Sequence, residues 1–194
     1  MRVSIYLVTK RGIDLFGAVS LIIILSPILL VLSILVKLTS NGPVIHWSKR
    51  IGRDNEVFLM AKFRTMKIET PQIATHLMSD PDSYLTSIGG YFRRKSLDEL
   101  PQLVNILKGE ISFVGPRPAL FNQEDLIEAR TKVKVHSIRP GITGWAQIHG
   151  RDEIPIPQKV EYDHYYLENR SLFLDFRILL ETFFKVIRED GVSH

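Results

Sequence analysis

The chain begins with one long apolar segment. Residues 15–36 carry no charged side chain, and a helix of about twenty apolar residues is long enough to cross the hydrocarbon core of a bilayer. A cleaved secretory signal has a shorter apolar stretch, of about 7–15 residues, and ends at small residues. Val36, Lys37 and Leu38 stand at the end of this segment instead. The pattern therefore predicts a membrane helix, with a straight spanning helix as the simplest interpretation.

Two features favour a bent helix whose ends lie on the same side of the membrane. Pro27 follows Ser26 in the middle of the segment; proline removes a backbone hydrogen bond and bends a helix, and the serine hydroxyl can satisfy the freed carbonyl. Both flanks are basic, with Lys10 and Arg11 before the segment and Lys37, Lys49, Arg50 and Arg53 after it. Since basic flanks favour the cytoplasmic side, we expect residues 1–40 to form a re-entrant anchor bent at Ser26 and Pro27.

Residues 41–194 are expected to fold as one unit with this anchor, and local patterns in them predict a hairpin and a short helix. The β-prone runs 44–47 and 57–63, joined by turn-forming residues, predict a β-hairpin. Further along, helical spacing predicts a short core helix that stops at Gly109, with these apolar positions: Leu100, Leu103, Val104 and Leu107. The expected fold class is α+β and mostly helical.

Loops and amphipathic helices are expected in the remainder. Residues 67–90 have weak periodicity and indicate a loop with at most one short helix. The prolines and glycines of residues 115–150 predict a loop-rich region, and such loops often carry functional sites. Residues 172–188 carry an apolar stripe at helical spacing, formed by Leu172, Phe176, Leu179, Leu180, Phe183 and Ile187. This stripe fits either core packing or a helix lying in the membrane interface.

Composition narrows the class of partner. The 194 residues suit one domain, and the absence of cysteine excludes disulfides, thiolate zinc sites and a cysteine nucleophile. The net charge of +4 suggests an anionic partner, such as a nucleotide, lipid head groups or a nucleic acid. The basic residues stand beside acids and prolines rather than in a stripe interleaved with aromatics, which disfavours nucleic acid.

The most informative stretch for chemistry is R-R-K-S-L-D-E-L-P-Q at residues 93–102. One interpretation is structural, with Ser96 and Glu99 as a helix capping box. Pro101 disfavours it, because proline suits the first helical position, and Asp98 and Glu99 would then lie just before a helix start that attracts phosphate. Among the preceding cations, one carboxylate can attack phosphorus and the other can hold Mg²⁺.

Three further motifs present arginine or lysine in defined positions. The run G-P-R-P at residues 115–118 holds Arg117 between two prolines, and R-P-G-I-T-G at 139–144 combines Arg139 with glycines that allow close approach to an anion. A turn with a solvated arginine explains either motif equally well. Lys62 and Arg64, in K-F-R-T-M, fit a ligand contact or an ordinary strand edge.

Taken together, these motifs resemble one family: the small monotopic phosphoglycosyl transferases, also called bacterial sugar transferases. The basic-then-apolar start with Ser26 and Pro27, the motifs at 62–66 and 96–102, and those at 115–118 and 139–144 occur in the family order. The resemblance covers nearly the whole chain and is closest to the minimal form of the family. Lys67, Ile68 and Glu69 stand where many relatives are more acidic, so no metal role is assigned there.

The resemblance implies a two-step reaction at the cytoplasmic face of a bacterial inner membrane. Asp98 would attack the β-phosphate of a UDP-sugar and release UMP, and undecaprenyl phosphate would then take the phosphosugar, as the first membrane step of glycoconjugate assembly. Glu99 would bind Mg²⁺ as cofactor, and Arg93 would meet the acceptor phosphate. Arg117 and Arg139 would line the donor phosphates or uridine, with Lys62 and Arg64 as further substrate contacts.

Two alternatives use the same residues. A metal-dependent hydrolase of nucleotide sugars would have water as acceptor, and a membrane-anchored scaffold would use the basic surface without catalysis. The expected partners are the UDP-sugar, undecaprenyl phosphate and membrane lipid, and not a nucleic acid. A homo-oligomer is compatible with the sequence, which does not specify the sugar or the downstream glycoconjugate.

Overall fold

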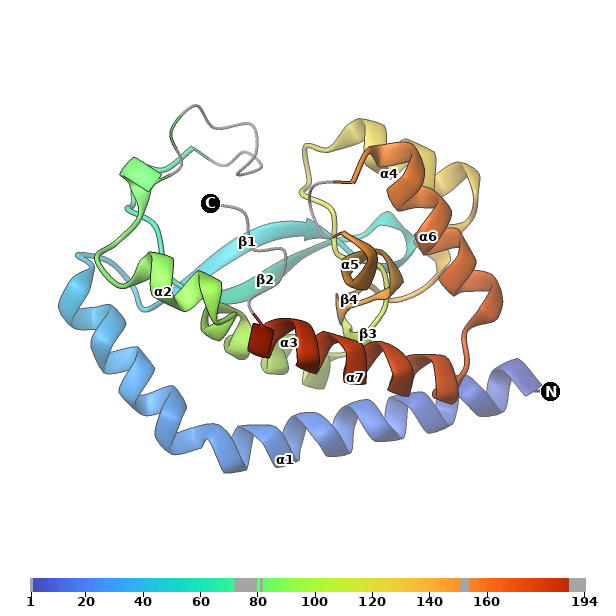
Figure 1. Cartoon of the computed structure of the whole chain (residues 1–194), viewed down its shortest axis with the longest axis horizontal. Helices are drawn as coiled ribbons and strands as arrows, with labels where there is room; N and C mark the ends of the chain where they lie inside the picture. The colour runs from blue at the N-terminus through green and yellow to red at the C-terminus, as the bar shows by residue number, and fades with distance from the viewer. Residues whose placement is uncertain (1, 72–79, 81, 151–153, 189–194) are drawn as a thin grey trace.

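The computed structural model describes residues 2–71, 80, 82–150 and 154–188. Its first element is a single helix, α1 (Arg2–Thr39), which stays helical through Pro27. Figure 1 shows α1 as two straight arms joined by a bend, and proline is the usual cause of such a bend. Pro27 has no N–H for the carbonyl of Ile23, and the Ser26 hydroxyl donates to that oxygen at 2.8 Å instead. The predicted bend is therefore present, and this substitute bond lets the helix bend without stopping.

Both arms of α1 pack against the same body of the protein. On the first arm, the buried Asp14 carboxylate accepts hydrogen bonds from the Ser112 hydroxyl and the Phe113 N–H at 3.1 and 3.2 Å. On the second arm, Leu32 and Val36 are buried in a cluster with aromatic residues from later segments. The anchor and the rest of the chain thus share their cores.

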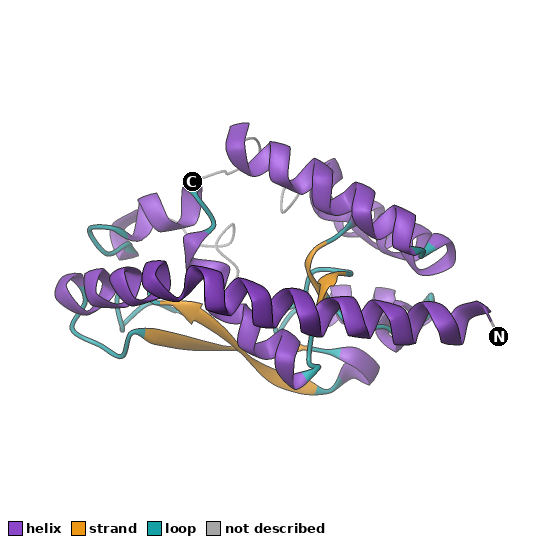
Figure 2. Ribbon diagram, turned by 90° about the horizontal axis from the view of Figure 1, so that it is seen from below, coloured by secondary structure: helices purple, strands orange, loops and turns teal. Residues whose placement is uncertain are grey.

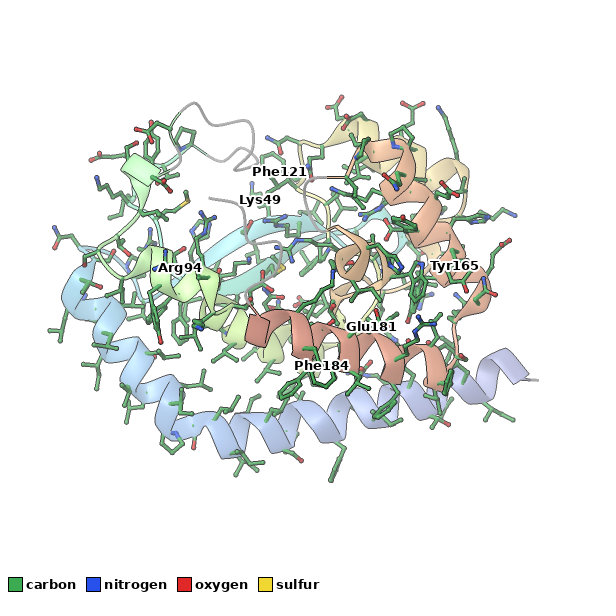
Figure 3. All side chains as sticks on the ribbon, viewed as in Figure 1. Lys49, Arg94, Phe121, Tyr165, Glu181 and Phe184 are labelled. Carbon is green, nitrogen blue, oxygen red and sulfur yellow. The ribbon has the colours of Figure 1, made fainter. Side chains whose placement is uncertain are left out.

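The opposite side of α1 is uncovered and apolar. Its most apolar stretch has a mean hydropathy of 3.0, and only 11% of that stretch is buried inside the protein. The side chains along the outer edge of α1 in Figure 3 are almost entirely carbon. The most exposed apolar residues of this helix include Phe16, Ile23, Ile24 and Leu38, each about two thirds exposed or more. The core helix of a soluble protein would be mostly buried, so this exposure supports contact with lipid.

The predicted hairpin is present. Strands β1 (Ile45–Ile51) and β2 (Val57–Phe63) pair antiparallel, with Ile45 opposite Phe63 and Ile51 opposite Val57. A short 3₁₀ turn (Arg53–Asn55) joins them, and Asp54 there adopts the left-handed φ of 55°. One face of β2 enters the core through Phe58 and Met60, which pack with Ala18 of α1.

Two short helices and a 3₁₀ helix follow. Helix α2 (Gly89–Arg94), which the sequence pattern did not reveal, leads to a 3₁₀ helix (Leu97–Gln102) and then to α3 (Leu103–Lys108). Gly109 ends α3 in the left-handed conformation, as predicted. The expected burial of Val104 is wrong: Val104 is 42% exposed, whereas Asn105 and Ile106 are fully buried. The preceding 3₁₀ turn changes the phase of the helix, which brings this different face to the core.

The region expected to be loop-rich contains more regular structure than its prolines and glycines suggested. Strands β3 (Ser112–Val114) and β4 (Gly141–Thr143) form a short parallel pair. Between and after them lie α4 (Glu124–Lys132) and α5 (Trp145–His149). The 67–90 loop lies partly outside the described residues; within the described part it contains a 3₁₀ turn at Asp82–Tyr84.

Helices α6 (Ile156–Asn169) and α7 (Leu172–Arg188) complete the described chain. In Figure 2, α1 runs across the molecule between α7 on one side and the hairpin on the other. The prediction that the apolar stripe of α7 packs in the core is wrong. Phe176 and Phe183 of the stripe are 64% and 60% exposed, while Leu174 and Ile178 on another face of α7 are buried. The stripe is thus available to the membrane interface, the other interpretation of the pattern.

Candidate active site

Asp98 and Glu99 lie on the 3₁₀ helix that leads into α3. Ser96 has a left-handed φ of 54° and makes no capping hydrogen bond through its side chain, so the capping box is absent. The two carboxylates precede α3, as expected, but Pro101 is not its first residue, because Pro101 lies inside the 3₁₀ helix and α3 begins at Leu103. However, α3 has only six residues, so its dipole is too small to attract phosphate by itself.

Two cations from other segments converge on the carboxylates. Lys62, near the end of β2, has its Nζ 2.7 Å from Glu99 Oε1 and 3.7 Å from Asp98 Oδ2. Arg117, in the loop after β3, donates from Nη2 to the same Glu99 oxygen at 3.1 Å. Glu99 therefore holds two positive charges next to Asp98 through a single oxygen.

The adjacent carboxylates have opposite pKa shifts. Burial raises the pKa of Asp98, which is 6% exposed; the charge of Lys62 lowers it and that of Glu99 raises it further. Burial also opposes the ionisation of Glu99, but Lys62 and Arg117 outweigh it and hold the pKa of Glu99 well below its usual range. Carboxylates whose environments separate their pKa values in this way are suited to different roles.

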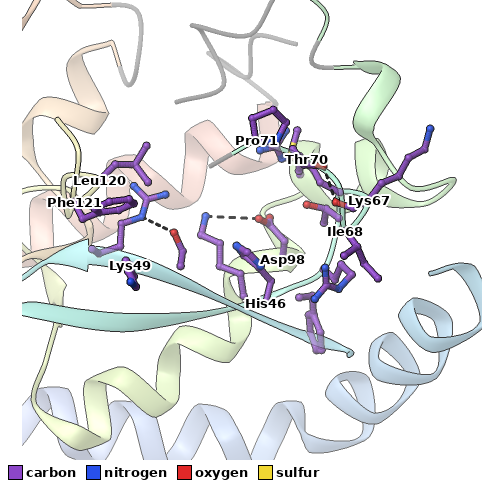
Figure 4. Close-up of a pocket in the computed structure, with 17 residues that line it drawn as sticks. His46, Lys49, Lys67, Ile68, Thr70, Pro71, Asp98, Leu120 and Phe121 are labelled. Carbon is purple, nitrogen blue, oxygen red and sulfur yellow. Dashed lines mark hydrogen bonds and ion pairs between the residues drawn. The ribbon is translucent and has the colours of Figure 1, made fainter. Parts of the chain in front are cut away.

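Asp98 borders a first cavity that is strongly basic. This cavity, of about 340 Å³, runs between the hairpin and residues 64–71. Figure 4 shows Asp98 in contact with the lysine of β2 in the middle of the lining, and Phe121 at one end. Burial, then the charges of Arg64, Lys62 and Arg50, lower the pKa of His46. The cavity can therefore accommodate a polyanion such as a diphosphate.

Asp98 also borders a second cavity with a different character. This one, of about 330 Å³, lies between the 3₁₀ helix, α1 and α7. Its apolar lining includes Leu21 and Leu25 of α1 and Val186 of α7, and Asp98, Glu99 and Arg117 are among its polar lining residues. A ligand with a charged head and an apolar tail fits such a lining.

The other predicted cations divide into two groups. Arg93 lines both cavities and Arg64 lines the first, where its Nε also donates to the carbonyl of Pro43 at 2.9 Å. Arg139 lines neither. Its Nε donates to the carbonyl of Gly109 at 2.9 Å, beyond the far end of α3, and it lines a separate cavity. The structure thus brings Lys62, Arg64, Arg93 and Arg117 together with the carboxylates, but not Arg139.

A buried ion pair supports the backbone of Arg117. Arg130 of α4 donates from Nη1 to the Arg117 carbonyl at 2.8 Å. The same guanidinium contacts Asp163 Oδ2 of α6 through Nε and Nη2, at 2.9 and 2.6 Å. The exposed fractions of the Arg130 and Asp163 side chains are only 9% and 1%.

The glycines of residues 139–144 serve packing rather than anion binding. A Cβ on Gly141 would clash with the backbone of Gly115, and a Cβ on Gly144 would clash with the same residue. The expectation that these glycines leave room for an anion is therefore wrong, because the backbone of the 115–118 loop fills that space.

Gln147 is a site residue that the sequence pattern did not reveal. It lies on α5, is 8% exposed and lines the second cavity. Among the described residues, neither its Oε1 nor its Nε2 has a hydrogen-bond partner. Buried polar groups are nearly always paired in folded proteins, so this amide is a candidate ligand contact.

Comparison with known proteins agrees with this geometry. Residues 5–189 match the family described as bacterial sugar transferase. The chain is 41% identical over 188 residues to an uncharacterized sugar transferase, EpsL, of Bacillus subtilis. This match covers 96% of the chain and 91% of EpsL.

Two longer relatives have names that specify substrates. A UDP-N-acetylgalactosamine-undecaprenyl-phosphate N-acetylgalactosaminephosphotransferase of Aeromonas hydrophila is 39% identical over 92% of this chain, and a UDP-glucose:undecaprenyl-phosphate glucose-1-phosphate transferase of Escherichia coli is 40% identical over 91%. The matches span only 43% and 39% of those two proteins. The matched region contains both cavities and the carboxylates between them, and the chain belongs to the bacterial sugar transferase family.

Proposed function

We propose that this chain transfers a sugar 1-phosphate from a UDP-sugar to undecaprenyl phosphate, with Asp98 as the nucleophile. The observation that carries the proposal is the position of Asp98, the one aspartate that borders both the basic cavity and the apolar-walled cavity in the described part of the chain. A carboxylate between two cavities can receive a group from a ligand in one and pass it to a ligand in the other.

The first step would take place from the basic cavity. An oxygen of ionised Asp98 attacks the β-phosphorus of the UDP-sugar, the bond from that phosphorus to the bridging oxygen breaks, and UMP leaves with the electron pair. Lys62 and Arg93 border the same space and would neutralise charge on the transferring phosphoryl group.

The second step would use the other cavity. A phosphate oxygen of undecaprenyl phosphate attacks the same phosphorus, the bond to Asp98 breaks, and the carboxylate is regenerated as the polyprenyl diphosphate sugar forms. Leu21, Leu25 and Val186 offer an apolar wall for the prenyl chain. This wall favours a lipid acceptor over water, and so a transferase over a hydrolase.

Mg²⁺ fits the carboxylate pair as a cofactor. In the described part of the chain no three His, Asp or Glu side chains gather as a metal site, but Mg²⁺ commonly uses one or two carboxylates and completes its shell with substrate phosphates and water. Lys62 and Arg117 both contact Oε1 of Glu99, which leaves Oε2 for the ion. Bound there, it would offset the charge of the leaving phosphate.

The anchor fits a protein that works from one face of the membrane. We infer that α1 is re-entrant, since both of its arms pack on one body and its outer edge is apolar. The exposed stripe of α7 would lie in the interface on the same side. The catalytic domain would then face the cytoplasm.

The test uses the purified protein with Mg²⁺, undecaprenyl phosphate and a panel of UDP-sugars, with UMP release as the readout. We expect release with at least one donor, loss of release in Asp98→Asn, and a phosphosugar adduct on Asp98 by mass spectrometry when the acceptor is omitted. UMP release at full rate without the lipid would favour the hydrolase. Substantial transfer by Asp98→Asn would remove the covalent mechanism.

A further inference from the structure

A third cavity lies away from Asp98, against the first arm of α1. It has a volume of about 450 Å³ and shares no lining residue with the other two cavities. Its walls come from α1, the hairpin turn, residues 137–139 and the link between α6 and α7. None of the steps proposed for sugar transfer uses it.

The charge of this cavity is one-sided. Among the described lining residues, Asp14 is the one carboxylate. Five cations also line the cavity: Lys10, Arg11, Arg53, Arg139 and Arg170. Asp14 is already engaged by hydrogen bonds from Ser112 and Phe113. Burial lowers the pKa of Arg139, and the nearby positive charges of Arg11 and Arg53 lower it further.

Structural roles account for only part of this charge. Arg11 caps the end of α3 through the carbonyls of Ile106 and Leu107, and Lys10 pairs with Asp175 at 2.7 Å. Arg139 uses only its Nε in the bond to Gly109. Arg170 forms no hydrogen bond or ion pair within the described chain, and Arg53 meets only the neighbouring, solvent-exposed Asp54. The guanidinium groups of Arg53, Arg139 and Arg170 thus retain donors for a ligand.

The rim of the cavity is apolar on the side of the anchor. Leu7 and Val8 of α1 line it and are 43% and 74% exposed. Arg170 lies just before α7, whose first residues Leu172 and Phe173 are also exposed. Basic cavities beside apolar anchor surfaces suit a phosphate head group whose acyl chains lie against the apolar side.

We propose that this cavity binds the phosphate of an anionic phospholipid head group, as a site separate from sugar transfer. Arginine is suited to the role because its fork of donors matches phosphate oxygens. The bound lipid would hold the first arm of α1 and the start of α7 at the depth of the head groups. The same phosphate chemistry can come from solution, and the test separates the two sources.

The test measures thermal unfolding of the full chain in detergent with three probes: dioctanoyl phosphatidylglycerol, dioctanoyl phosphatidylcholine and inorganic phosphate. The double variant Arg53→Gln and Arg170→Gln removes two lining charges without touching the carboxylates. Arg177→Gln is the matched control, since Arg177 is an exposed α7 cation paired with Glu181 and lies outside the cavity. If the double variant unfolds without lipid, the single variants Arg53→Gln and Arg170→Gln replace it in the test.

We expect phosphatidylglycerol to raise Tm in the parent and in Arg177→Gln, and phosphatidylcholine to have a much smaller effect. The double variant should need at least about tenfold more phosphatidylglycerol for the same shift, and each single variant an intermediate amount. Inorganic phosphate could raise Tm as strongly as phosphatidylglycerol and lose this effect in the double variant. That result would support a phosphate site but overturn the proposal that its ligand is a lipid. Equal responses of the double variant, Arg177→Gln and the parent would overturn the site.

Discussion

The buried pair of Arg130 and Asp163 offers the sharpest test of how the site is held together. Replacing Asp163 with leucine leaves a guanidinium that is 9% exposed without its carboxylate. Removing one partner of a buried ion pair costs about 3–5 kcal/mol. In a chain of this size each kcal/mol moves Tm by about 2–4 °C, so Asp163→Leu should lower Tm by roughly 6–20 °C.

A neighbouring pair on the same helix supplies the control. Lys132 and Glu128 of α4 lie 2.7 Å apart, but their side chains are 70% and 69% exposed. Solvent screens such a pair, so Lys132→Met should leave Tm unchanged. The double variant Arg130→Met and Asp163→Leu should be more stable than Asp163→Leu alone, because no unpaired charge remains in the core.

Thermal unfolding in detergent, followed by circular dichroism, measures these shifts. UMP release should fall in Asp163→Leu even at temperatures where the protein is folded, since Arg130 also binds the carbonyl of Arg117. A Tm for Asp163→Leu equal to that of Lys132→Met would refute the reasoning that burial makes this pair important.

Three other predictions concern the chemistry and the anchor. Burial raises the pKa of Asp98, whereas the charge of Lys62 lowers it. Because the attacking carboxylate is ionised, UMP release should decline as pH falls through the raised pKa of Asp98, and Lys62→Met should move this decline to higher pH. A pH-rate profile that does not move in Lys62→Met would contradict the role of Lys62. Gln147→Leu removes an unpaired buried amide, so Tm should stay equal or rise while the KM for one substrate rises about tenfold or more. An unchanged KM for both substrates in steady-state kinetics would exclude a contact between Gln147 and either substrate. Single cysteines at Ile5 and Asn41, one near each end of α1, should react with an impermeant thiol reagent from the same side of the membrane, and labelling from opposite sides would rule out the re-entrant arrangement.

Local patterns in the sequence were enough for several elements. The apolar segment, the hairpin and the end of the short helix at Gly109 all depend on neighbouring residues, namely hydrophobic runs, turn formers and a glycine cap. The motif at residues 96–102 likewise indicated Asp98 and Glu99 as a pair, since their adjacency is a property of the chain itself. Helices α4, α5 and α6 were missed because their short or weakly apolar patterns resemble those of loops.

Tertiary structure decided which of the candidate residues meet. Lys62 and Arg117 come from segments 37 and 18 residues away from Glu99, and Arg139 was equally plausible until the fold carried it to the far end of α3. The exposed face of α7 was also beyond local pattern, since an apolar stripe looks the same whether protein or lipid covers it. The sequence by itself determined the apolar helix, the hairpin, the end of α3 at Gly109 and the carboxylate pair, because these arise from short-range chemistry. The cations, cavities and burial that give the pair its opposite pKa shifts came only from packing between distant segments, which depends on the whole fold.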